Sequence, residues 1–224
     1  MKKHIKIVKN ILGKNDEAAG ANRRLAADLG VEIINIISSP GSGKTTLLEK
    51  TIPALRHDGY ESAVIVGDLQ TTRDAERLGE TEAEVVQVNT EGGCHLSAPQ
   101  VAEAMANLDL ENISFLFIEN VGNMVCPSSF DLGERRRVAL LSTPEGADKV
   151  AKYDKLFLTV DAVLLNKTDL ADVLGYNRNQ FYEDMARING RTKIMEISAV
   201  TGEGLDRWNR WLLSSGQDTE RKLV

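Results

Sequence analysis

The sequence is poor in cysteine and in aromatic residues, and it contains no long apolar run. Its 224 residues include two cysteines, Cys94 and Cys126, and aromatic residues make up 5% of the chain. No apolar run approaches the ~18 residues that span a bilayer. No apolar segment follows the basic start of the chain, as one would in a secretory signal. These absences predict a cytoplasmic protein without a membrane partner, in which a disulfide between the two cysteines is not expected.

An excess of basic residues is also missing. The 27 Lys and Arg residues are outnumbered by 33 Asp and Glu residues, which gives a formal net charge of −6. A nucleic-acid-binding protein would carry a basic stripe. The one tight basic cluster, residues 135–137, is interpreted instead as the solvated start of a strand. The charge distribution therefore predicts no nucleic-acid partner.

Short apolar runs alternate with helical patterns along the chain. The predicted strands are residues 31–37, 63–66, 85–88, 115–118, 138–141, 162–165 and 194–197. The predicted helices between and after them are residues 45–56, 71–78, 98–108, 176–188 and 205–213. Strands that are apolar on both faces and separated by helices are typical of a parallel sheet covered on both sides. The pattern predicts an α/β fold with a mostly parallel, twisted sheet and helices on both faces.

A further helix is expected before the first strand. Residues 15–29 have an amphipathic pattern, and Asn15 or Asp16 is the predicted N-cap. We therefore expect an accessory helical region at residues 1–30 and a single large domain at residues 31–224. The isolated histidines His4 and His57 are interpreted as surface residues.

A phosphate-binding loop follows the first predicted strand. Its sequence is Ser38-Ser39-Pro40-Gly41-Ser42-Gly43-Lys44-Thr45-Thr46, and it opens a predicted helix, as the motif requires. Gly41 and Gly43 let backbone amides face the phosphates, and the helix N-terminus adds partial positive charge. Lys44 is expected to reach the β- and γ-phosphates, and Thr45 to meet Mg²⁺. Ser38 replaces the usual first glycine, but the order of strand, loop, Lys-Thr and helix disfavours a chance glycine-rich turn.

A candidate base-reading motif, Asn166-Lys167-Thr168-Asp169, ends the strand at residues 162–165. Asp169 can accept two hydrogen bonds from guanine, whereas adenine offers no matching donors, so a site of this kind rejects adenine strongly. We expect Asn166 to brace the phosphate loop and the stem of Lys167 to pack on the base. Ser198-Ala199 would present a backbone amide to the guanine oxygen, although an ordinary turn is an alternative interpretation. The expected nucleotides are GTP and GDP.

Acidic residues follow two neighbouring predicted strands. Asp68 comes after the strand at 63–66 and Glu119 after the strand at 115–118. The carboxyl ends of strands meet the ligand in open α/β sheets, so both are predicted at Mg²⁺ or its waters. Asp74 could position the attacking water or be a solvated helix residue. Lys44, Asp68, Asp74 and Glu119 are thus the candidate catalytic residues. No glutamine or arginine finger is recognised, so slow unaided hydrolysis is expected.

The segment at residues 118–127 connects a candidate phosphate sensor to a soft metal ligand. Glu119-x-x-Gly122 lies where a phosphate-loop nucleotidase would sense the terminal phosphate, and Cys126 follows four residues later. Two glycines before Cys94-His95 permit a bent loop from which both side chains could turn inward. Cys94, His95 and Cys126 would suit Zn²⁺ or Ni²⁺. Three ligands leave room for water or a second chain, and a two-fold dimer would bring six together. Two buried cysteines and an unrelated histidine are the alternative.

These motifs together resemble one known family, the nickel-insertion GTPase of [NiFe]-hydrogenase maturation, called HypB. The resemblance covers nearly the whole chain from Asn15 onward. It is carried by Ser38-Ser39-Pro40-Gly41-Ser42-Gly43-Lys44-Thr45-Thr46, Gly67-Asp68-Leu69-Gln70-Thr71-Thr72-Arg73-Asp74-Ala75, Gly93-Cys94-His95-Leu96, Glu119-Asn120-Val121-Gly122-Asn123-Met124-Val125-Cys126-Pro127, Pro144-Glu145-Gly146 and Leu164-Leu165-Asn166-Lys167-Thr168-Asp169. Some members of the family carry an N-terminal cysteine-rich motif or a histidine-rich stretch. Neither is found in this sequence, so tight nickel sequestration is not expected.

The resemblance implies a phosphate-loop G domain of the signal-recognition/MinD-like (SIMIBI) branch. It implies a GTP-hydrolysing nickel metallochaperone that forms a GTP-dependent homodimer, with Cys94, His95 and Cys126 at a metal site on the dimer interface. The implied partners are other hydrogenase maturation proteins and the hydrogenase large subunit. Three alternatives stay open: a GTPase serving urease, a dimerisation module with a structural zinc site, and an ATPase of the MinD branch.

Overall fold

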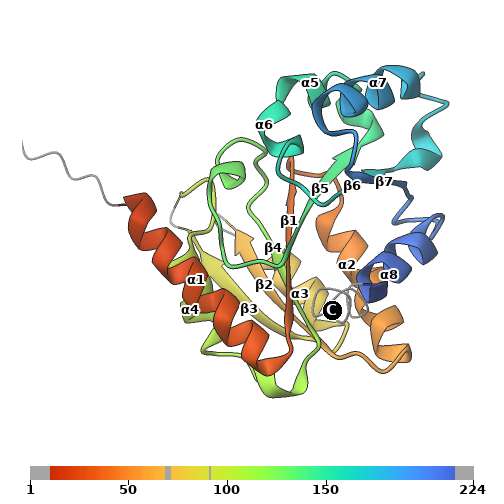
Figure 1. Cartoon of the computed structure of the whole chain (residues 1–224). Helices are drawn as coiled ribbons and strands as arrows, with labels where there is room; N and C mark the ends of the chain where they lie inside the picture. The colour runs from red at the N-terminus through yellow and green to blue at the C-terminus, as the bar shows by residue number, and fades with distance from the viewer. Residues whose placement is uncertain (1–10, 69–71, 91, 215–224) are drawn as a thin grey trace, which may run out of the picture.

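The structure is a computed structural model that describes residues 11–68, 72–90 and 92–214 (Figure 1). His4 and the Leu69-Gln70-Thr71 part of the motif around Asp68 lie outside the described residues. Among the described residues, no helix is both long enough and apolar enough to cross a membrane.

Seven strands form one sheet in the order β3-β2-β4-β1-β5-β6-β7. Their bounds are β1 Glu32–Ser38, β2 Ser62–Asp68, β3 Glu84–Asn89, β4 Phe115–Glu119, β5 Arg136–Ser142, β6 Ala162–Asn166 and β7 Lys193–Glu196. Every pair of neighbours is parallel. The seven predicted strands are therefore confirmed, and the sheet is wholly rather than mostly parallel. Because all strands run the same way, their carboxyl ends share one edge of the sheet, where ligands bind in such folds.

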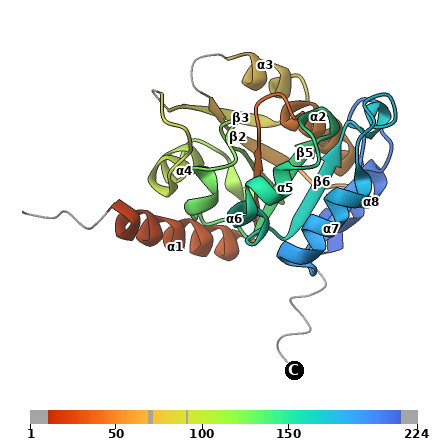
Figure 2. The same ribbon diagram turned by 90° about the horizontal axis from the view of Figure 1, so that it is seen from above.

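Helices cover both faces of the sheet, as predicted (Figure 2). One face carries α2 Lys44–His57, α3 Arg73–Gly79 and α8 Leu205–Leu213. The other face carries α1 Ile11–Leu29 and α4 Ala98–Met105 over the half of the sheet that ends in β3. Over the remaining half, that face carries α5 Lys149–Lys152, α6 Asp154–Phe157 and α7 Arg178–Asn189. Short 3₁₀ turns lie at Leu110–Asn112, Pro127–Ser129, Thr143–Glu145 and Thr168–Leu170.

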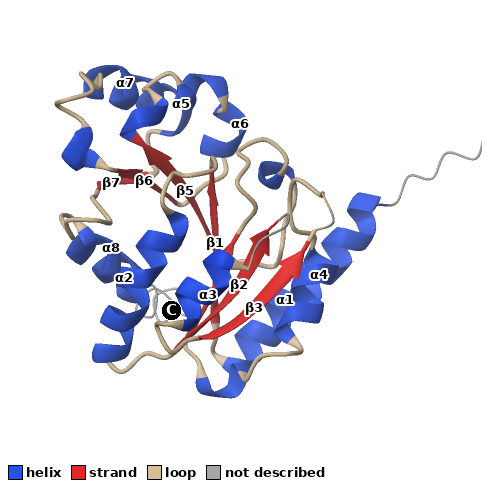
Figure 3. Ribbon diagram, turned by 180° about the vertical axis from the view of Figure 1, so that it is seen from behind, coloured by secondary structure: helices blue, strands red, loops and turns tan. Residues whose placement is uncertain are grey.

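The apolar cores explain why polar and apolar residues do not alternate along the strands. In β1, residues such as Ile34 and Ile36 pack under α2, while Ile33 and Ile37 pack on the opposite side. Burial of both faces makes a strand apolar throughout. Figure 3 shows the resulting layers of helix, sheet and helix from behind.

Helix α8 is held against the phosphate-loop helix α2 by a buried tryptophan. Trp208 is 0% exposed, and its Nε1 donates to the Thr51 hydroxyl in α2 at 2.9 Å. Its ring stacks on Trp211 with centroids 5.4 Å apart. Because a buried indole needs a partner for its N–H, this hydrogen bond defines how the two helices pack.

The predicted N-cap of the first helix is wrong. Helix α1 already includes Ile11, the first described residue, so Asn15 lies inside it and is 3% exposed. Its carboxamide donates to the carbonyl of Asp131 at 2.7 Å and accepts from the amide of Ala98 at 2.8 Å. Asn15 therefore bonds to two loops instead of capping its own helix. The predicted helix at residues 176–188 also starts later, because Asn177 caps α7 by accepting from the amide of Gln180.

The basic cluster at residues 135–137 starts a strand as predicted and Arg135 is exposed, but Arg136 and Arg137 are not solvated. Arg136 is 8% exposed and forms an ion pair with Glu32. Its guanidinium lies 4.0 Å from the ring centroid of Trp211 and donates to that residue's carbonyl. Arg137 pairs with Glu134 at 2.6 Å, and both side chains are largely buried. These arginines are structural because the buried carboxylates of Glu32 and Glu134 neutralise their charges.

Candidate nucleotide and metal site

The phosphate loop borders a cavity of about 350 Å³ at the carboxyl edge of the sheet. Gly41, Gly43, Lys44, Thr45 and Thr46 line one side of it, and they lie in the loop between β1 and α2 or in the first turn of α2. Gly41 and Gly43 have φ values of 72° and 104°. Such left-handed backbone favours glycine, which explains the two glycines in the loop.

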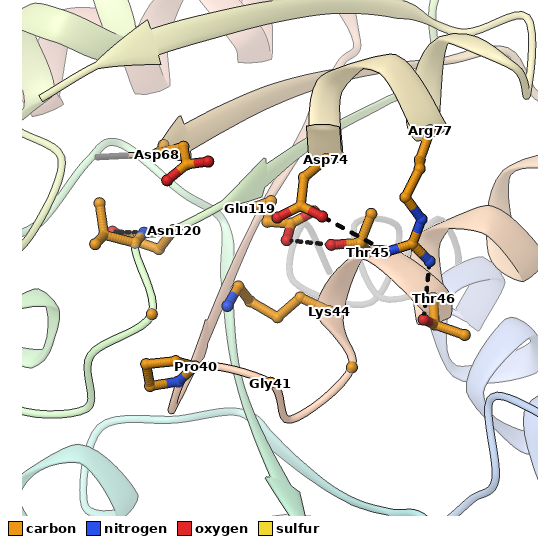
Figure 4. Close-up of a pocket in the computed structure, with 14 residues that line it drawn as sticks. Pro40, Gly41, Lys44, Thr45, Thr46, Asp68, Asp74, Arg77, Glu119 and Asn120 are labelled. Carbon is orange, nitrogen blue, oxygen red and sulfur yellow. Dashed lines mark hydrogen bonds and ion pairs between the residues drawn. The ribbon is translucent and has the colours of Figure 1, made fainter. Parts of the chain in front are cut away.

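The Lys44 ammonium points into this cavity (Figure 4). Its Nζ donates to the Ser38 hydroxyl at 3.0 Å, and burial lowers the pKa of Lys44. Ser38, the residue that departs from the usual motif, thus supplies an acceptor that glycine would lack. A cation held by one neutral hydroxyl in a buried site gains strongly from an incoming anion.

Glu119, the last residue of β4, faces Lys44 across the cavity. Its Oε1 accepts a hydrogen bond from the Thr45 hydroxyl at 2.8 Å. Its Oε2 is buried and, within the described part of the chain, has no hydrogen-bond partner. Burial raises the pKa of Glu119 to about 7, while the nearby Lys44 acts in the opposite direction.

The donors around Glu119 fit a magnesium ion. Mg²⁺ in nucleotide sites takes one or two carboxylates, a hydroxyl and phosphate oxygens. The unpartnered Oε2 of Glu119 and the adjacent Thr45 hydroxyl are oxygen donors of this kind. Asp68, the last residue of β2, lines the same cavity. The residues present therefore suit Mg²⁺.

Asp74 and Arg77 complete the wall on the side of α3. They are three positions apart on that helix and form an ion pair at 3.5 Å. Arg77 also binds Glu49 at 2.6 Å and the Thr46 hydroxyl at 3.1 Å. No arginine was predicted for this cavity, although the i, i+3 spacing from Asp74 could have suggested Arg77.

Gly122 brings the segment after β4 against the phosphate loop. A Cβ at Gly122 would lie 3.0 Å from the Cα of Pro40. Because a side chain would not fit without displacing the loop, this position favours glycine. The predicted sensor Glu119-x-x-Gly122 therefore contacts the nucleotide cavity at both ends.

The base-reading motif lies behind the phosphate loop. The carboxamide of Asn166 donates to the Ser42 carbonyl at 2.8 Å, and Lys167 Nζ donates to the Gly41 carbonyl at 2.7 Å. Lys167 has a φ of 60°, which is unusual for a residue with a Cβ. Asp169 is exposed, in the 3₁₀ turn that follows. The base-reading motif is thus hydrogen-bonded directly to the phosphate loop.

The two backbone amides of Ser198-Ala199 are already used within the chain. The amide of Ser198 donates to the Glu203 carbonyl at 2.9 Å, and the amide of Ala199 donates to Asn166 Oδ1 at 3.0 Å. The pair lies next to the base motif, and its contact with the guanine oxygen stays a prediction.

The three predicted soft ligands converge. The ligand atoms of Cys94, His95 and Cys126 all lie within 4.8 Å of one another, and each residue is partly exposed. Within the described residues, this is the one group of three or more such side chains that could hold a metal ion. Gly92 has a φ of 89°, and the Gly93 amide donates to the Thr90 carbonyl at 2.8 Å, which bends the loop before Cys94. Both adjacent ligands can therefore face one point.

The surroundings of the cluster orient its ligands. The His95 ring stacks on Phe130 with centroids 3.8 Å apart. Burial lowers the pKa of His95, which favours the neutral imidazole that binds metals. A hydrogen bond with Cys126 raises the pKa of Cys94. Asn123 donates to the Cys94 carbonyl at 3.3 Å and so joins the two loops that carry the cysteines.

The first strand of the parallel sheet leads through a glycine-rich loop into a helix, and a lysine and several carboxylates surround one cavity. This combination defines a phosphate-loop nucleotide-binding protein. Residues 32–196 match the CobW/HypB/UreG nucleotide-binding domain. The chain belongs to this family, and HypB proteins are among its relatives.

Curated relatives support the HypB assignment. The hydrogenase maturation factor HypB of Rhizobium leguminosarum bv. viciae is 47% identical over 208 residues, which cover 93% of this chain and 69% of that protein. The hydrogenase/urease maturation factor HypB of Helicobacter hepaticus is 42% identical over 91% of this chain and 85% of that protein.

Solved structures support the same fold class. HypB from Helicobacter pylori in complex with nickel is 38% identical, with a TM-score of 0.87 over 92% of this chain and 96% of that chain. The signal recognition particle 54 kDa protein of Aeropyrum pernix shares the fold alone, at 15% identity and a TM-score of 0.55 over 75% of this chain and 41% of that chain. The predicted SIMIBI-type fold is thereby confirmed.

Proposed function

We propose that this protein is a GTP-hydrolysing metallochaperone that couples its nucleotide state to the delivery of nickel during hydrogenase maturation. One observation carries the proposal: the segment that starts at the end of β4 has Glu119 and Gly122 on the nucleotide cavity and Cys126 in the metal cluster. The names of its HypB relatives and the nickel complex of one of them support nickel as the delivered metal.

The nucleotide chemistry follows from the residues around the cavity. A bound phosphate chain would draw Lys44 away from Ser38, because a phosphate is a better acceptor for an ammonium than a hydroxyl is. Thr45, Glu119 and Asp68 would hold Mg²⁺, which when bound neutralises charge on the β- and γ-phosphates. Asp74 would orient the attacking water through its carboxylate.

Guanine selection is assigned to Asp169. Its carboxylate would accept two hydrogen bonds from guanine, while Asn166 and Lys167 keep the motif on the phosphate loop. The test is turnover of GTP and of ATP by Asp169→Asn. The substitution should weaken the preference for GTP, since an amide repels one of the two guanine donors. An unchanged preference would remove Asp169 from base reading and reopen the possibility of an ATPase.

We propose that the metal cluster binds its metal ion in a homodimer. One chain offers three ligands, and all three residues are partly exposed. A second copy related by a two-fold axis would add three more ligands and close the site. GTP would favour this dimer, and hydrolysis would move the segment from Glu119 to Cys126 and release the metal to another maturation protein or to the hydrogenase large subunit.

The decisive experiment measures binding of Ni²⁺ and of Zn²⁺ with GDP and with a slowly hydrolysed GTP analogue. A nucleotide can change metal affinity only if it binds the two metal states differently, so the proposal requires unequal affinities. Equal affinities would contradict the coupling.

Cys126→Ala should abolish hydrogenase maturation while the fold and GTP hydrolysis persist. Retained maturation would instead favour a purely structural metal.

A second candidate function is the maturation of urease. It is favoured by the name of the Helicobacter hepaticus relative, which includes both hydrogenase and urease. The two functions share the nucleotide and metal chemistry and differ in the recipient enzyme. Complementation of a strain lacking its own copy, with hydrogenase and urease activities measured separately, distinguishes them.

A further inference from the structure

Two asparagines lie in the interior of the sheet, where apolar residues are the rule. Asn35 in the middle of β1 is 0% exposed, and Asn120 directly after β4 is 1% exposed. A carboxamide at such a depth is costly unless its hydrogen bonds are made. The bonds of these two side chains therefore indicate what they hold in place.

The bonds form a chain with a defined direction. Asn120 Oδ1 accepts from the amides of Val121 at 2.9 Å and Leu96 at 3.4 Å. Because a backbone amide can only donate, the Asn120 oxygen must face these groups and its nitrogen must face Asn35. Asn120 Nδ2 donates to Asn35 Oδ1 at 3.1 Å, and Asn35 Nδ2 donates to Glu134 at 3.2 Å. A carboxylate at the far end accepts only, which agrees with the same direction.

Leu96 connects this chain to the metal ligands. It directly follows His95, and it is 0% exposed. A Cβ at Gly67 would lie 2.8 Å from the Leu96 Cγ, so the leucine packs against the end of β2. Gly67 and Asn120 both line the nucleotide cavity. The residue after a metal ligand thus contacts two strand ends that form the wall of the nucleotide site.

We propose that Asn120 is a positioning residue that transmits the state of the nucleotide cavity to the loop carrying Cys94 and His95. The inference rests on the proposed function, in which nucleotide and metal are coupled. It adds a second connection, which runs from the same segment to the other loop of the metal cluster. The bond from the Leu96 amide, at 3.4 Å, is near the upper limit for a hydrogen bond. A shift of Asn120 by a few tenths of an ångström, as nucleotide binds beside it, is sufficient to strengthen or break this bond.

The experiment uses the full chain and compares the affinity for Ni²⁺ alone in the presence of GDP and of a slowly hydrolysed GTP analogue. The ratio of the two affinities is the coupling factor. Asn120→Ala removes the acceptor for Leu96 and should bring the ratio to within about twofold of one. Binding is measured at one protein concentration, with the oligomeric state recorded, so that a change in dimerisation is not mistaken for a change in coupling.

Asn22→Ala is the matched control. Asn22 is also buried, at 3% exposure, and donates to the carbonyls of Ala98 and Leu132 at 3.0 Å. It supports a segment close to the metal loop but is not part of the cavity wall. Its loss should lower metal affinity in both nucleotide states alike and leave the ratio at the wild-type value.

The outcomes separate this inference from the function on which it rests. A wild-type ratio of one contradicts the proposed function itself. If Asn120→Ala keeps the wild-type ratio, the role of Asn120 is overturned and the proposed function stays intact. The same conclusion follows if Asn22→Ala loses coupling to the same extent as Asn120→Ala. Thermal unfolding checks that each variant is folded. If Asn120→Ala is not, Asn120→Ser is used, because its hydroxyl can serve Val121 but cannot span to Leu96 and Asn35 together.

Discussion

The nucleotide cavity and the metal cluster lie on adjoining loops but are built differently. Two charged groups of the cavity are buried, with Lys44 8% and Glu119 3% exposed, and they come from the start of a helix and the end of a strand. The three ligands of the cluster are partly exposed and lie on loops. Val125, beside Cys126, is 58% exposed. Buried groups of one chain can therefore surround bound phosphates and Mg²⁺, whereas the proposed dimer would add ligands to the partly exposed cluster.

This difference in burial also predicts how strongly each region responds to substitution. Buried charges respond strongly to loss of a partner, because no water replaces it. Ligands on a partly exposed loop depend more on the groups that orient them. Substitutions of the buried charges in the cavity should thus have larger effects than substitutions around the cluster.

The largest effect is expected for Lys44→Ala. Loss of the buried ammonium should lower the rate of GTP hydrolysis by about 10²–10³-fold, because it removes a positioned positive charge from the transferring phosphate. Metal affinity without nucleotide should not change. Phosphate release and Ni²⁺ titration check both expectations. Lys50→Ala, on the exposed side of the same helix, should leave both unchanged; the comparison between the regions fails if Lys44→Ala weakens metal binding without nucleotide.

The second effect concerns stability against pH. The folded protein raises the pKa of Glu119 from its ordinary value of 4.5 to about 7. Between these values the folded state holds a proton that the unfolded state has lost, so the free energy of unfolding falls as pH rises. The difference corresponds to at most about 3 kcal/mol. Glu119→Gln lacks this dependence and should gain stability over the wild type as pH rises through this range.

Chemical denaturation of both proteins in the presence of a chelator measures this effect, at about pH 5 and about pH 8. Added Mg²⁺ should restore stability to the wild type at the higher pH and have little effect on Glu119→Gln. If the stability difference between the two proteins is the same at both pH values, the buried, protonated Glu119 is refuted.

A smaller effect is expected from removing the ring that orients His95. Phe130→Ala should lower Ni²⁺ affinity about tenfold, since groups that orient a ligand contribute to metal binding. Phe130→Leu, which keeps apolar volume without the stacked ring, should lie between the alanine variant and the wild type. Hydrolysis of GTP by the monomer should be the same in all three. A normal metal affinity in Phe130→Ala would show that the stack does not orient His95.

The smallest effect is expected for Arg77→Ala. The Arg77 side chain is 43% exposed, so loss of its ion pairs with Glu49 and Asp74 should cost less than about 1 kcal/mol of stability. Turnover of GTP should fall only severalfold, because Arg77 positions α3 beside the cavity. Denaturation and phosphate release measure the two quantities. A loss of turnover as large as that of Lys44→Ala would instead identify Arg77 as a group that touches the phosphates.

Sequence patterns predicted the fold well because the parallel sheet leaves a simple signature. Residues such as Ile34 and Phe117 must be apolar on whichever side they point, and the helices between the strands follow from the topology. The start of α1 was mispredicted for a different reason. Asn15 looks like a cap by local rules, but its carboxamide bonds to Asp131 and Ala98, which are distant in sequence.

The site residues likewise divide into those that a local sequence signal predicts and those that depend on contacts distant in sequence. Lys44 and Glu119 could be named because a motif or the end of a strand predicts where they lie. Arg77 and Asn120 could not, because their importance depends on contacts with Thr46 and Leu96 that only the folded chain creates. Likewise Arg136 was mispredicted as solvated, since its burial depends on pairing with Glu32.

The tryptophan pair described above has an optical consequence. The chain contains two tryptophans, Trp208 and Trp211, and they stack on one another in α8. All tryptophan fluorescence therefore originates from this stacked pair, in which Trp208 is hydrogen-bonded to Thr51 of the phosphate-loop helix. Intrinsic fluorescence is thus a built-in, label-free reporter of movement between that helix and α8.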